Sequence, residues 1–540
     1  MINIIGNAIG AGQSTANPAF IMEVDTTIAG ALPDNQFELR VHAGQGYPYN
    51  YDLTTSDGQS FTGLTNNQTI TFPAPGVYTL KITGTFPGTN YGGSNESKKI
   101  IDIKNWGAIE WRRALSAFQG CENLTTFSAS DYPDFSLLDT NGMRQMFQSC
   151  TNLNADFSKW DVSTVATFDR AFNLCSSFNN DSVCNWDTSS STAFNNCFAS
   201  CTVFDQDLSN WDVSNATNFF DMFLNASAYN NGGQALTWTL GSGSISLGRV
   251  FGNTSFNQDI SSWNTSTVGS MRSLFQGSDF NNPSINNWDT SSVTDMRYMF
   301  ASSPFNQDIS GWDVSNVTLV EFMFNGSFNQ PIGSWTLSSC TNFNFMFYGC
   351  ASFNQDLSAW DVSAVTSMAG MFQESGTALK TLNIGGWNTG NVQNLQSFCL
   401  SARITDDLSG WDVSSCTNFQ TFVSFGKIFF DLSPWAVQGA VSLNNMIRDT
   451  YTDQIIVDQW DFSGWDISQC TTLGTQFALA ETLTTANYDA TLISWAAQAP
   501  VNALTAHFGN SQYTLGGAAE AARNTLINTY GWTIIDGGGI

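Results

Sequence analysis

The sequence predicts an α/β solenoid of repeats about 25 residues long, preceded by a small β domain and followed by a capping segment. Three observations predict this fold class. The stretch FNQDLSAWDVSAVTSMAGMF at 353–372 returns with few changes at 305–324 and 204–223. Tryptophan recurs every 23 to 27 residues from Trp160 to Trp435, a period typical of repeat proteins. The two ends of the chain carry other patterns, so we expect separate terminal segments.

Each repeat contains signals for a short strand, a turn and a short helix. In the repeat of Trp288, Met296 lies eight residues after the tryptophan and Phe300 follows four residues later. Such an apolar i, i+4 pair is typical of one helix face, and the Ser or Asn of DVSNV is a helix-capping residue. The LS-x-W segment before the tryptophan is typical of a strand. Because one repeat cannot bury its apolar face alone, neighbouring repeats are expected to stack as leucine-rich repeats do.

The ends predict two further domains. Residues 1–105 show alternating strand signals (AFIMEVDTT, QFELRVHA, YNYDLTT, QTITF and GVYTLKITGTF) separated by turns, which predicts a β-sandwich of Ig or PKD type. Residues 106–480 hold the repeats. Residues 481–540, with NYDATLISWAAQAP and GGAAEAARNTLINTYGWTIIDGG, predict amphipathic helices around a short strand that cap the last repeat.

Composition narrows the function classes. The chain has 45 acidic and 18 basic residues, a formal net charge of −27, which disfavours nucleic acid because phosphate binding needs clustered Lys and Arg. No apolar run approaches the ~18 residues of a membrane span. The N-terminus lacks the basic and apolar regions of a secretory signal. We therefore expect no nucleic acid, no membrane insertion and no export signal in the chain as written.

The unit FNQDLSxWDVSNVTxMxxMF resembles the repeat of BspA-like leucine-rich-repeat surface proteins, which occur in many bacteria and also in phages and protists. The N-terminal β domain, the WGxIxW junction at 106–111 and the closing YDATLISW to GWTIIDGG segment are similar to longer members in aquatic Bacteroidetes and their phages. One departure is YDLTTSDG at 51–58, where such members often carry a DWGDG-like turn. The resemblance implies surface exposure and adhesion or partner binding. It supplies no catalytic residues.

Aspartates recur four residues before the tryptophan and again one residue after it. If the carboxylates stack on adjacent repeats, bound Ca²⁺ would relieve their repulsion. The alternative is that they accept backbone N–H groups at turns. The sequence leaves both alternatives open, capping being favoured and no cofactor being required. The candidate Ca²⁺ ligands are four residues of the first column: Asp207, Asp259, Asp308 and Asp356.

The remaining chemistry-bearing residues give little sign of catalysis. Seven of the eleven cysteines occupy repeat columns that other repeats fill with valine or small residues, so we expect free buried thiols. The two histidines, His42 and His507, lie in different terminal segments. No catalytic or nucleotide-binding motif is present. We therefore predict that the protein is not an enzyme.

One column departs from the pattern and gives the candidate binding site. Ten residues after the tryptophan the chain is expected to face solvent, yet three consecutive repeats place Tyr298, Phe322 and Phe345 there, with Arg297 and Glu321 beside them. An exposed aromatic strip suits stacking on a sugar or contact with a protein partner. A contact between subunits of a homo-oligomer, or packing under an inserted loop, is the alternative.

These expectations combine into a functional hypothesis. We expect a non-enzymatic structural or adhesion protein on the surface of a virion, of fibre type and used for host attachment. The N-terminal domain would bind other virion or surface proteins, and the repeats would bind a glycan or protein receptor on the host. The alternatives are a secreted bacterial cell-surface adhesin and a carbohydrate-binding or carbohydrate-active protein.

Overall fold

The structure is a computed structural model that describes residues 18–44, 46–425, 430–435, 437–448, 460–473 and 482–540. By its internal contacts the chain divides into two compact units, Met1–Thr267 and Val268–Ile540. The first unit holds the N-terminal strands and the earlier repeats. The second holds the later repeats and the C-terminal helices.

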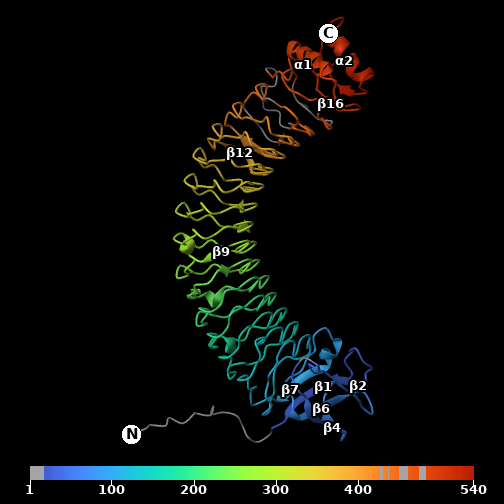
Figure 1. Cartoon of the computed structure of the whole chain (residues 1–540), viewed down its shortest axis with the longest axis vertical. Helices are drawn as coiled ribbons and strands as arrows, with labels where there is room; N and C mark the ends of the chain where they lie inside the picture. The colour runs from blue at the N-terminus through green and yellow to red at the C-terminus, as the bar shows by residue number, and fades with distance from the viewer. Residues whose placement is uncertain (1–17, 45, 426–429, 436, 449–459, 474–481) are drawn as a thin grey trace. The chain divides into compact units, whose positions relative to one another are not determined.

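The N-terminal residues form antiparallel β-structure. Five strands pair in the order β4-β3-β6-β1-β7, and β2 pairs with β5 in a separate two-stranded sheet. Each of the five stretches with strand signals contains one of these strands, because their alternating apolar residues face the core. Figure 1 shows β1, β6 and β7 together in blue. The bounds are β1 Phe20–Asp25, β2 Gln36–Leu39, β3 Asn50–Thr55, β4 Ser60–Leu64, β5 Gln68–Thr71, β6 Val77–Thr85 and β7 Ile100–Asn105.

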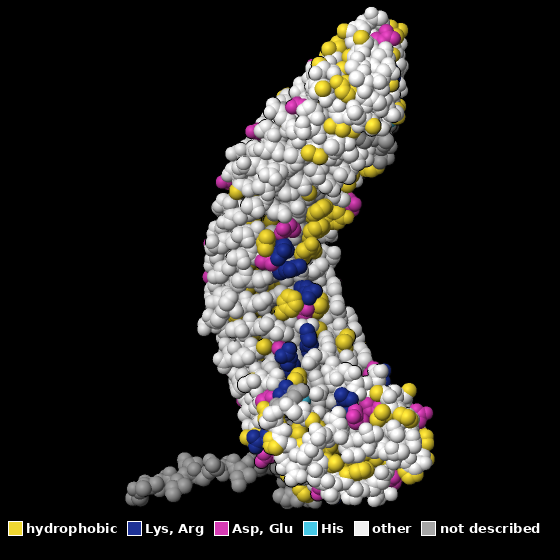
Figure 2. Space-filling view, turned by 45° about the vertical axis from the view of Figure 1, so that its right-hand side comes forward, with side chains coloured by type: hydrophobic (Ala, Val, Ile, Leu, Met, Phe, Trp, Pro, Cys, Tyr) yellow, Lys and Arg dark blue, Asp and Glu magenta, His cyan; other side chains and the backbone are white. Residues whose placement is uncertain are grey.

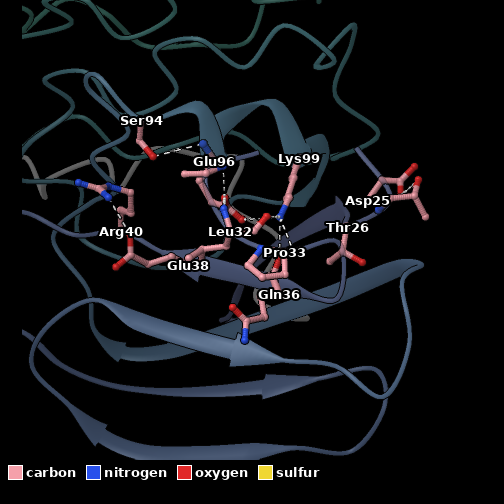
Figure 3. Close-up of polar contacts among 12 residues, drawn as sticks. Asp25, Thr26, Leu32, Pro33, Gln36, Glu38, Arg40, Ser94, Glu96 and Lys99 are labelled. Carbon is pink, nitrogen blue, oxygen red and sulfur yellow. Dashed lines mark hydrogen bonds and ion pairs between the residues drawn. The ribbon is translucent and has the colours of Figure 1, made fainter. Parts of the chain in front are cut away.

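A buried ion pair fixes the segment that leads into β2 (Figure 3). The Lys99 ammonium lies 3.0 Å from the Glu96 carboxylate, and both side chains are buried. Lys99 also donates to the carbonyls of Leu32, Pro33 and Gln36 at 3.1, 3.2 and 2.8 Å. The other Glu96 oxygen accepts the N–H of Leu32 at 3.1 Å. Because both charges are buried and paired with each other, removing either partner would strongly destabilise this segment.

Neighbouring repeats are joined by hydrogen bonds between equivalent positions. The indole N–H of Trp360 donates to the carbonyl of Ile332 in the preceding repeat at 3.0 Å. The side-chain oxygen of Asn329, the Asn of the FNQ motif, accepts the N–H of Asn354 in the next repeat at 2.9 Å. Inside, Phe324 stacks on Phe347 with ring centroids 5.8 Å apart. The residues that recur from repeat to repeat therefore provide hydrogen-bond partners and apolar contacts for the adjacent repeat.

The repeats contain short strands and no α-helix among their described residues. Where equivalent residues of neighbours pair, they do so in parallel, as Phe300 does with Phe324. The bounds are β8 Ile245–Ser246, β9 Val268–Ser270, β10 Phe300–Ser303, β11 Phe324–Gly326, β12 Gly376–Lys380, β13 Ala402–Ile404, β14 Val423–Ser424 and β15 Ile447–Arg448. The described residues also include short 3-10 turns, at Asn95–Lys99 in the N-terminal segment and at Asp181–Val183, Asn231–Gly233 and Pro283–Ile285 in the repeats.

The predicted α/β solenoid is wrong: the described chain is β-rich and its only two α-helices lie near the C-terminus. The apolar pair Met296 and Phe300 shows why. Between them Tyr298 has φ of +58°, which a right-handed helix cannot contain. The N–H groups of Tyr298 and Phe300 bond to the carbonyls of Glu321 and Met323 in the next repeat, at 3.0 Å each. The i, i+4 spacing of these apolar residues therefore comes from a turn whose backbone is hydrogen-bonded to the next repeat, and not from a helix.

The C-terminal segment holds α1 Thr485–Ala497, β16 Thr505–His507, α2 Ala518–Asn528 and β17 Thr533–Ile535. The strands β16 and β17 pair in parallel, and Figure 1 shows both helices in red at this end of the chain. Trp495 of α1 is buried and donates to the carbonyl of Phe462 at 3.1 Å. Among the described residues no helix has the length and apolar character to cross a bilayer. The predicted boundaries after residues 105 and 480 stay predictions.

Candidate functional site

One position in each repeat has the same unusual backbone, and we call it the left-handed column. It lies ten residues after the repeat tryptophan, and its φ angles fall between +52° and +61°. Glycine and asparagine adopt this conformation with least strain, whereas a bulky side chain costs about 1–2 kcal/mol. Its members are Arg170, Asn196, Asp221, Ser273, Tyr298, Phe322, Phe345, Gly370, Ser397, Thr421 and Asn445. In the repeat of Trp238 the equivalent left-handed residue is Arg249, one place later.

Tyr298, Phe322 and Phe345 form a continuous stack, which we call the aromatic ladder. The Tyr298 and Phe322 ring centroids are 5.1 Å apart with planes 7° from parallel, and those of Phe322 and Phe345 are 4.4 Å apart at 12°. All three side chains are half-buried. At the far end, a Cβ atom on Gly370 would overlap the ring of Phe345. The ladder therefore needs glycine in the next repeat, where the ring rests against the backbone.

This geometry decides which part of each ring can meet a ligand. Phe322 has both faces covered by its neighbours, and Phe345 has one face on Phe322 and the other against Gly370. A sugar stacks on an open ring face, which neither phenylalanine offers. The two phenylalanine rings instead present their edges, which form a narrow apolar ridge, whereas Tyr298 has one face on Phe322. Such a ridge suits contact with the apolar side chains of a protein.

Charged groups border the ladder. Arg297 donates two hydrogen bonds to Asp295, at 3.0 and 2.8 Å, which raise the pKa of the guanidinium. One carboxylate oxygen of Glu321 accepts from the Asn342 amide at 3.1 Å, and its other oxygen is buried with no hydrogen-bond partner among the described residues. Figure 2 shows basic and acidic side chains beside hydrophobic ones on a surface that is otherwise mostly uncharged. The five predicted site residues are thus brought together.

Three residues of this site were not predicted from the sequence. Tyr348 lies edge-on to Phe345 with centroids 6.2 Å apart, and its hydroxyl donates to Glu374 at 2.8 Å. Gly370 closes the stack. The sequence signal for Gly370 was available, since it follows three aromatic residues in the same column. Tyr348 and Glu374 lie in other columns, and no pattern linked them to the ladder.

The prediction that this column faces solvent is wrong for several repeats. Asp221, Ser273 and Ser397 are 5%, 3% and 7% exposed. These three short side chains are buried, whereas Asn196, Thr421 and Asn445 are half-buried like the aromatic side chains. Exposure in this column therefore varies from repeat to repeat.

The aspartate columns serve as hydrogen-bond acceptors at turns. The candidate Ca²⁺ ligands Asp207, Asp259, Asp308 and Asp356 each accept the N–H of the serine two residues later, at 2.8–2.9 Å. These bonds lower the pKa of the Asp259, Asp308 and Asp356 carboxyls. The carboxylates are therefore stabilised by their own turns.

The four aspartates also occupy alternate repeats, which was overlooked in the sequence. Gln234 lies at the equivalent position between Asp207 and Asp259, and Pro331 lies between Asp308 and Asp356. At roughly 4.8 Å per repeat such carboxylates are about 10 Å apart, whereas Ca²⁺ binds oxygen at about 2.3–2.6 Å. A single ion cannot bridge them. No group of three or more His, Cys, Asp or Glu residues is placed to hold a metal in the part of the chain that is described.

The cysteines are free thiols, as predicted, and all but Cys184 are buried. Along one column Cys150, Cys175 and Cys201 donate S–H to the carbonyls of Phe118, Phe147 and Phe172, at 3.1, 3.0 and 2.9 Å. Burial raises the pKa of Cys184 to about 11 and of Cys350 to about 12. These thiols are therefore protonated at neutral pH and act as small packing groups.

The two histidines belong to different units of the chain. His42 is buried in the first unit, and burial followed by the charge of Arg113 lowers its pKa to about 4. His507 lies in β16 of the second unit. A neutral buried imidazole of this kind is a poor general acid at neutral pH.

Comparison with known proteins places the repeats in a family. The sequence model of a family described as "Mycoplasma protein of unknown function, DUF285" matches residues 112–238, 245–356, 322–404, 356–460 and 401–513, together more than half of the chain. This agrees with the resemblance to BspA-like repeats. No curated protein and no solved structure matches the chain.

Proposed function

Because the chain belongs to the DUF285 family of proteins of unknown function, we propose a function from its own geometry: it is a non-catalytic surface protein that binds a partner protein on the edges of the aromatic ladder. The observation that carries this proposal is the presence of three bulky aromatic residues in the left-handed column. Among the other repeats, this position holds the low-strain residues Asn196, Asn445 and Gly370 as well as arginine, aspartate, serine and threonine.

The fold itself gives little reason for aromatic residues at this position. Each costs about 1–2 kcal/mol of backbone strain, while each stacked pair returns about 0.5–1.5 kcal/mol. The stabilisation from two stacked pairs is therefore at most equal to the backbone strain of the three residues. Strained residues of this kind are found at binding sites, where the strained side chain makes the contact. The ladder is therefore better explained by recognition than by stability.

The other chemical groups support a non-catalytic role. The repeat carboxylates accept hydrogen bonds from their own turns, as Asp308 does from Ser310. The thiols are protonated and mostly buried. With these groups engaged in the fold, the feature that remains for function is the surface of the repeats, which favours binding over catalysis.

We place this binding protein on the surface of a virion, where it would attach the particle to its host. The support is the resemblance to BspA-like members, some of which occur in phages. In this proposal residues 1–105 hold the protein to the particle through other virion proteins. A bacterial cell-surface adhesin is the second candidate, supported by the same resemblance to surface proteins of bacteria.

Two measurements test the proposal. Mass spectrometry of purified virus particles and of washed cell envelopes locates the chain. The virion assignment requires its peptides in particles, and their presence in envelopes alone would overturn it in favour of an adhesin. Flow cytometry with fluorescent full-length protein then measures binding to cells of the source culture. Protease treatment of the cells should abolish binding, whereas periodate treatment should not.

The matched variant for the binding measurement is Y298N/F322N/F345N, since asparagine already occupies this column at Asn196 and Asn445. We expect a loss of cell binding of at least about tenfold. The control is T421N, the same change outside the ladder, which should bind as the wild type does. Equal binding by the ladder variant and the wild type would show that the ladder is not the recognition surface.

A further inference from the structure

A second cluster in the left-handed column lies in the first unit and uses none of the ladder residues. Arg170, Asn196, Asp221 and Arg249 occupy this column in four successive repeats. Backbone hydrogen bonds join these repeats: the N–H of Arg170 donates to Asn195 at 2.8 Å, that of Asn196 to Phe220 at 3.0 Å, and that of Asp221 to Gly248 at 3.0 Å. The four side chains therefore follow one another along one face.

The cluster contains hydrogen-bond acceptors without donors. Asp221 is 5% exposed, and its Oδ1 has no hydrogen-bond partner among the described residues, while its Oδ2 lies 2.6 Å from Arg249. The Oδ1 atom of Asn195, in the adjoining repeat, is also buried without a partner in the described chain. Burial raises the pKa of Asp221 although the charges of Arg249 and Arg170 oppose this. Buried acceptors of this kind usually have a donor, so each of these two atoms is a place where a bound group could donate a hydrogen bond.

The same cluster contains donors without acceptors. Arg170 is exposed, and its guanidinium forms no hydrogen bond or ion pair with any residue that the structure describes. The Arg249 side chain is 40% exposed, and its guanidinium lies 4.9 Å from the centre of the Phe220 ring, which is itself 39% exposed. The face in Figure 2 likewise presents dark-blue basic side chains next to hydrophobic ones. On a chain of net charge −27, an exposed and unpaired arginine such as Arg170 is a place for an anion.

We propose that this cluster, which we call the arginine site, binds an acidic sugar: a pyranose ring that carries a carboxylate. The carboxylate would pair with the guanidinium of Arg170, since arginine binds carboxylates through two parallel N–H groups. The ring hydroxyls would donate to Asp221 Oδ1 and Asn195 Oδ1. The apolar C–H face of the ring would contact Phe220. The Arg249 guanidinium lies over this ring in the structure, so the contact uses the other ring face or follows the displacement of Arg249.

Arg249 is the movable part of the arginine site. Its guanidinium lies 2.6 Å from Asp221 Oδ2, and Asp221 Oδ1 is buried, so in this proposal Arg249 moves aside before a ligand hydroxyl reaches Oδ1. The ligand carboxylate held by Arg170 would also attract the Arg249 guanidinium away from Asp221, and a ligand hydroxyl would then donate to Asp221 Oδ1. A neutral sugar lacks the anion that moves Arg249, so the arginine site distinguishes acidic from neutral sugars.

Isothermal titration calorimetry on the full-length protein tests this proposal. The probes are the methyl glycosides of glucuronate, galacturonate and N-acetylneuraminate, with those of glucose and galactose as neutral matches. At least one acidic glycoside should bind and the neutral ones should not. The variants R170Q and D221N should weaken that binding at least about tenfold. R170Q is the more secure variant, since the Arg170 side chain is exposed and unpaired in the described structure and its loss should leave folding unchanged.

The matched control is R272Q, an exposed arginine nine residues after Trp263 that belongs to the second unit, and it should change the affinity less than about twofold. The ladder variant Y298N/F322N/F345N should also bind the acidic glycoside normally, so failure of this inference is distinguishable from failure of the proposed function. Absence of binding up to about 10 mM, equal binding of neutral glycosides, or undiminished binding by R170Q would each overturn the proposal.

Discussion

The tryptophan column and the left-handed column run through the same repeats and differ in what the fold requires of them. Ten tryptophans between Trp186 and Trp435 donate their indole N–H to a carbonyl of the preceding repeat at 2.8–3.3 Å. The left-handed column has an equally constant backbone but holds basic, acidic, polar, aromatic and glycine residues. The fold therefore fixes the residue in the first column and only the backbone in the second. Side chains in the second column are free to serve recognition.

The largest effect should come from the tryptophan column. Changing Trp360 to Ala removes a buried ring and its hydrogen bond to Ile332, and we expect a loss of about 3–5 kcal/mol in the free energy of unfolding. Urea unfolding followed by fluorescence measures this loss. W360F is the control that keeps most of the volume, and it should lose only about 1–3 kcal/mol because the Ile332 carbonyl stays buried without a donor. A loss below about 1 kcal/mol for W360A would show that the two columns do not differ in this way.

An intermediate effect should come from Gly370, where the left-handed column does constrain its residue. An alanine Cβ would meet the Phe345 ring and would also have to adopt φ of +61°. We expect G370A to cost about 1–3 kcal/mol, measured by thermal unfolding. In the double variant F345A/G370A the ring is absent, so adding alanine should cost only about 1 kcal/mol. Equal costs of G370A with and without Phe345 would show that the ring does not rest on Gly370.

A smaller effect on stability should come from the ladder itself. Y298N/F322N/F345N loses two stacked pairs but relieves three strained residues, so the free energy of unfolding should change by about 1 kcal/mol or less. Urea unfolding of the variant and the wild type measures the difference. A loss above about 3 kcal/mol would mean that the aromatic residues serve the fold, and the comparison between the two columns would then fail at this point.

The sequence predicts the constant columns better than the backbone that carries them. The Trp period, the buried thiols and the N-terminal strand segments follow from spacing and alternation, which are local signals. The predicted helix failed because Met296 and Phe300 keep helical spacing although their N–H groups bond to another repeat. That hydrogen bonding depends on the stacking of repeats, so the sequence of a single repeat does not reveal it.

The ladder was found because Tyr298, Phe322 and Phe345 depart from their column. Asp221 and Arg249 were missed as a pair because one extra residue in the repeat of Trp238 shifts Arg249 by one place.

The smallest effect should come from the aspartate after the tryptophan, where the fold requires an acceptor and not a charge. Asp313 accepts the N–H of Ser315 at 3.0 Å, and in another repeat Asn264 accepts that of Ser266 at 3.2 Å. D313N should therefore change stability near pH 7 by only about 0.5 kcal/mol or less.

The pH dependence separates the acceptor from the charge. Hydrogen bonds from Ser315 lower the pKa of the Asp313 carboxyl below 3.8. A carboxyl whose pKa is lower in the folded than in the unfolded state contributes stability above its unfolded pKa, and this contribution is lost as the pH falls through the folded pKa. Unfolding measured from about pH 5 to about pH 2 should show the wild type losing stability relative to D313N. If the stability of the two proteins instead changes with pH in the same way, the charged form of Asp313 is not bound more strongly by the turn than the neutral form. The fold would then require no charge at this position, just as it requires no particular side chain in the left-handed column.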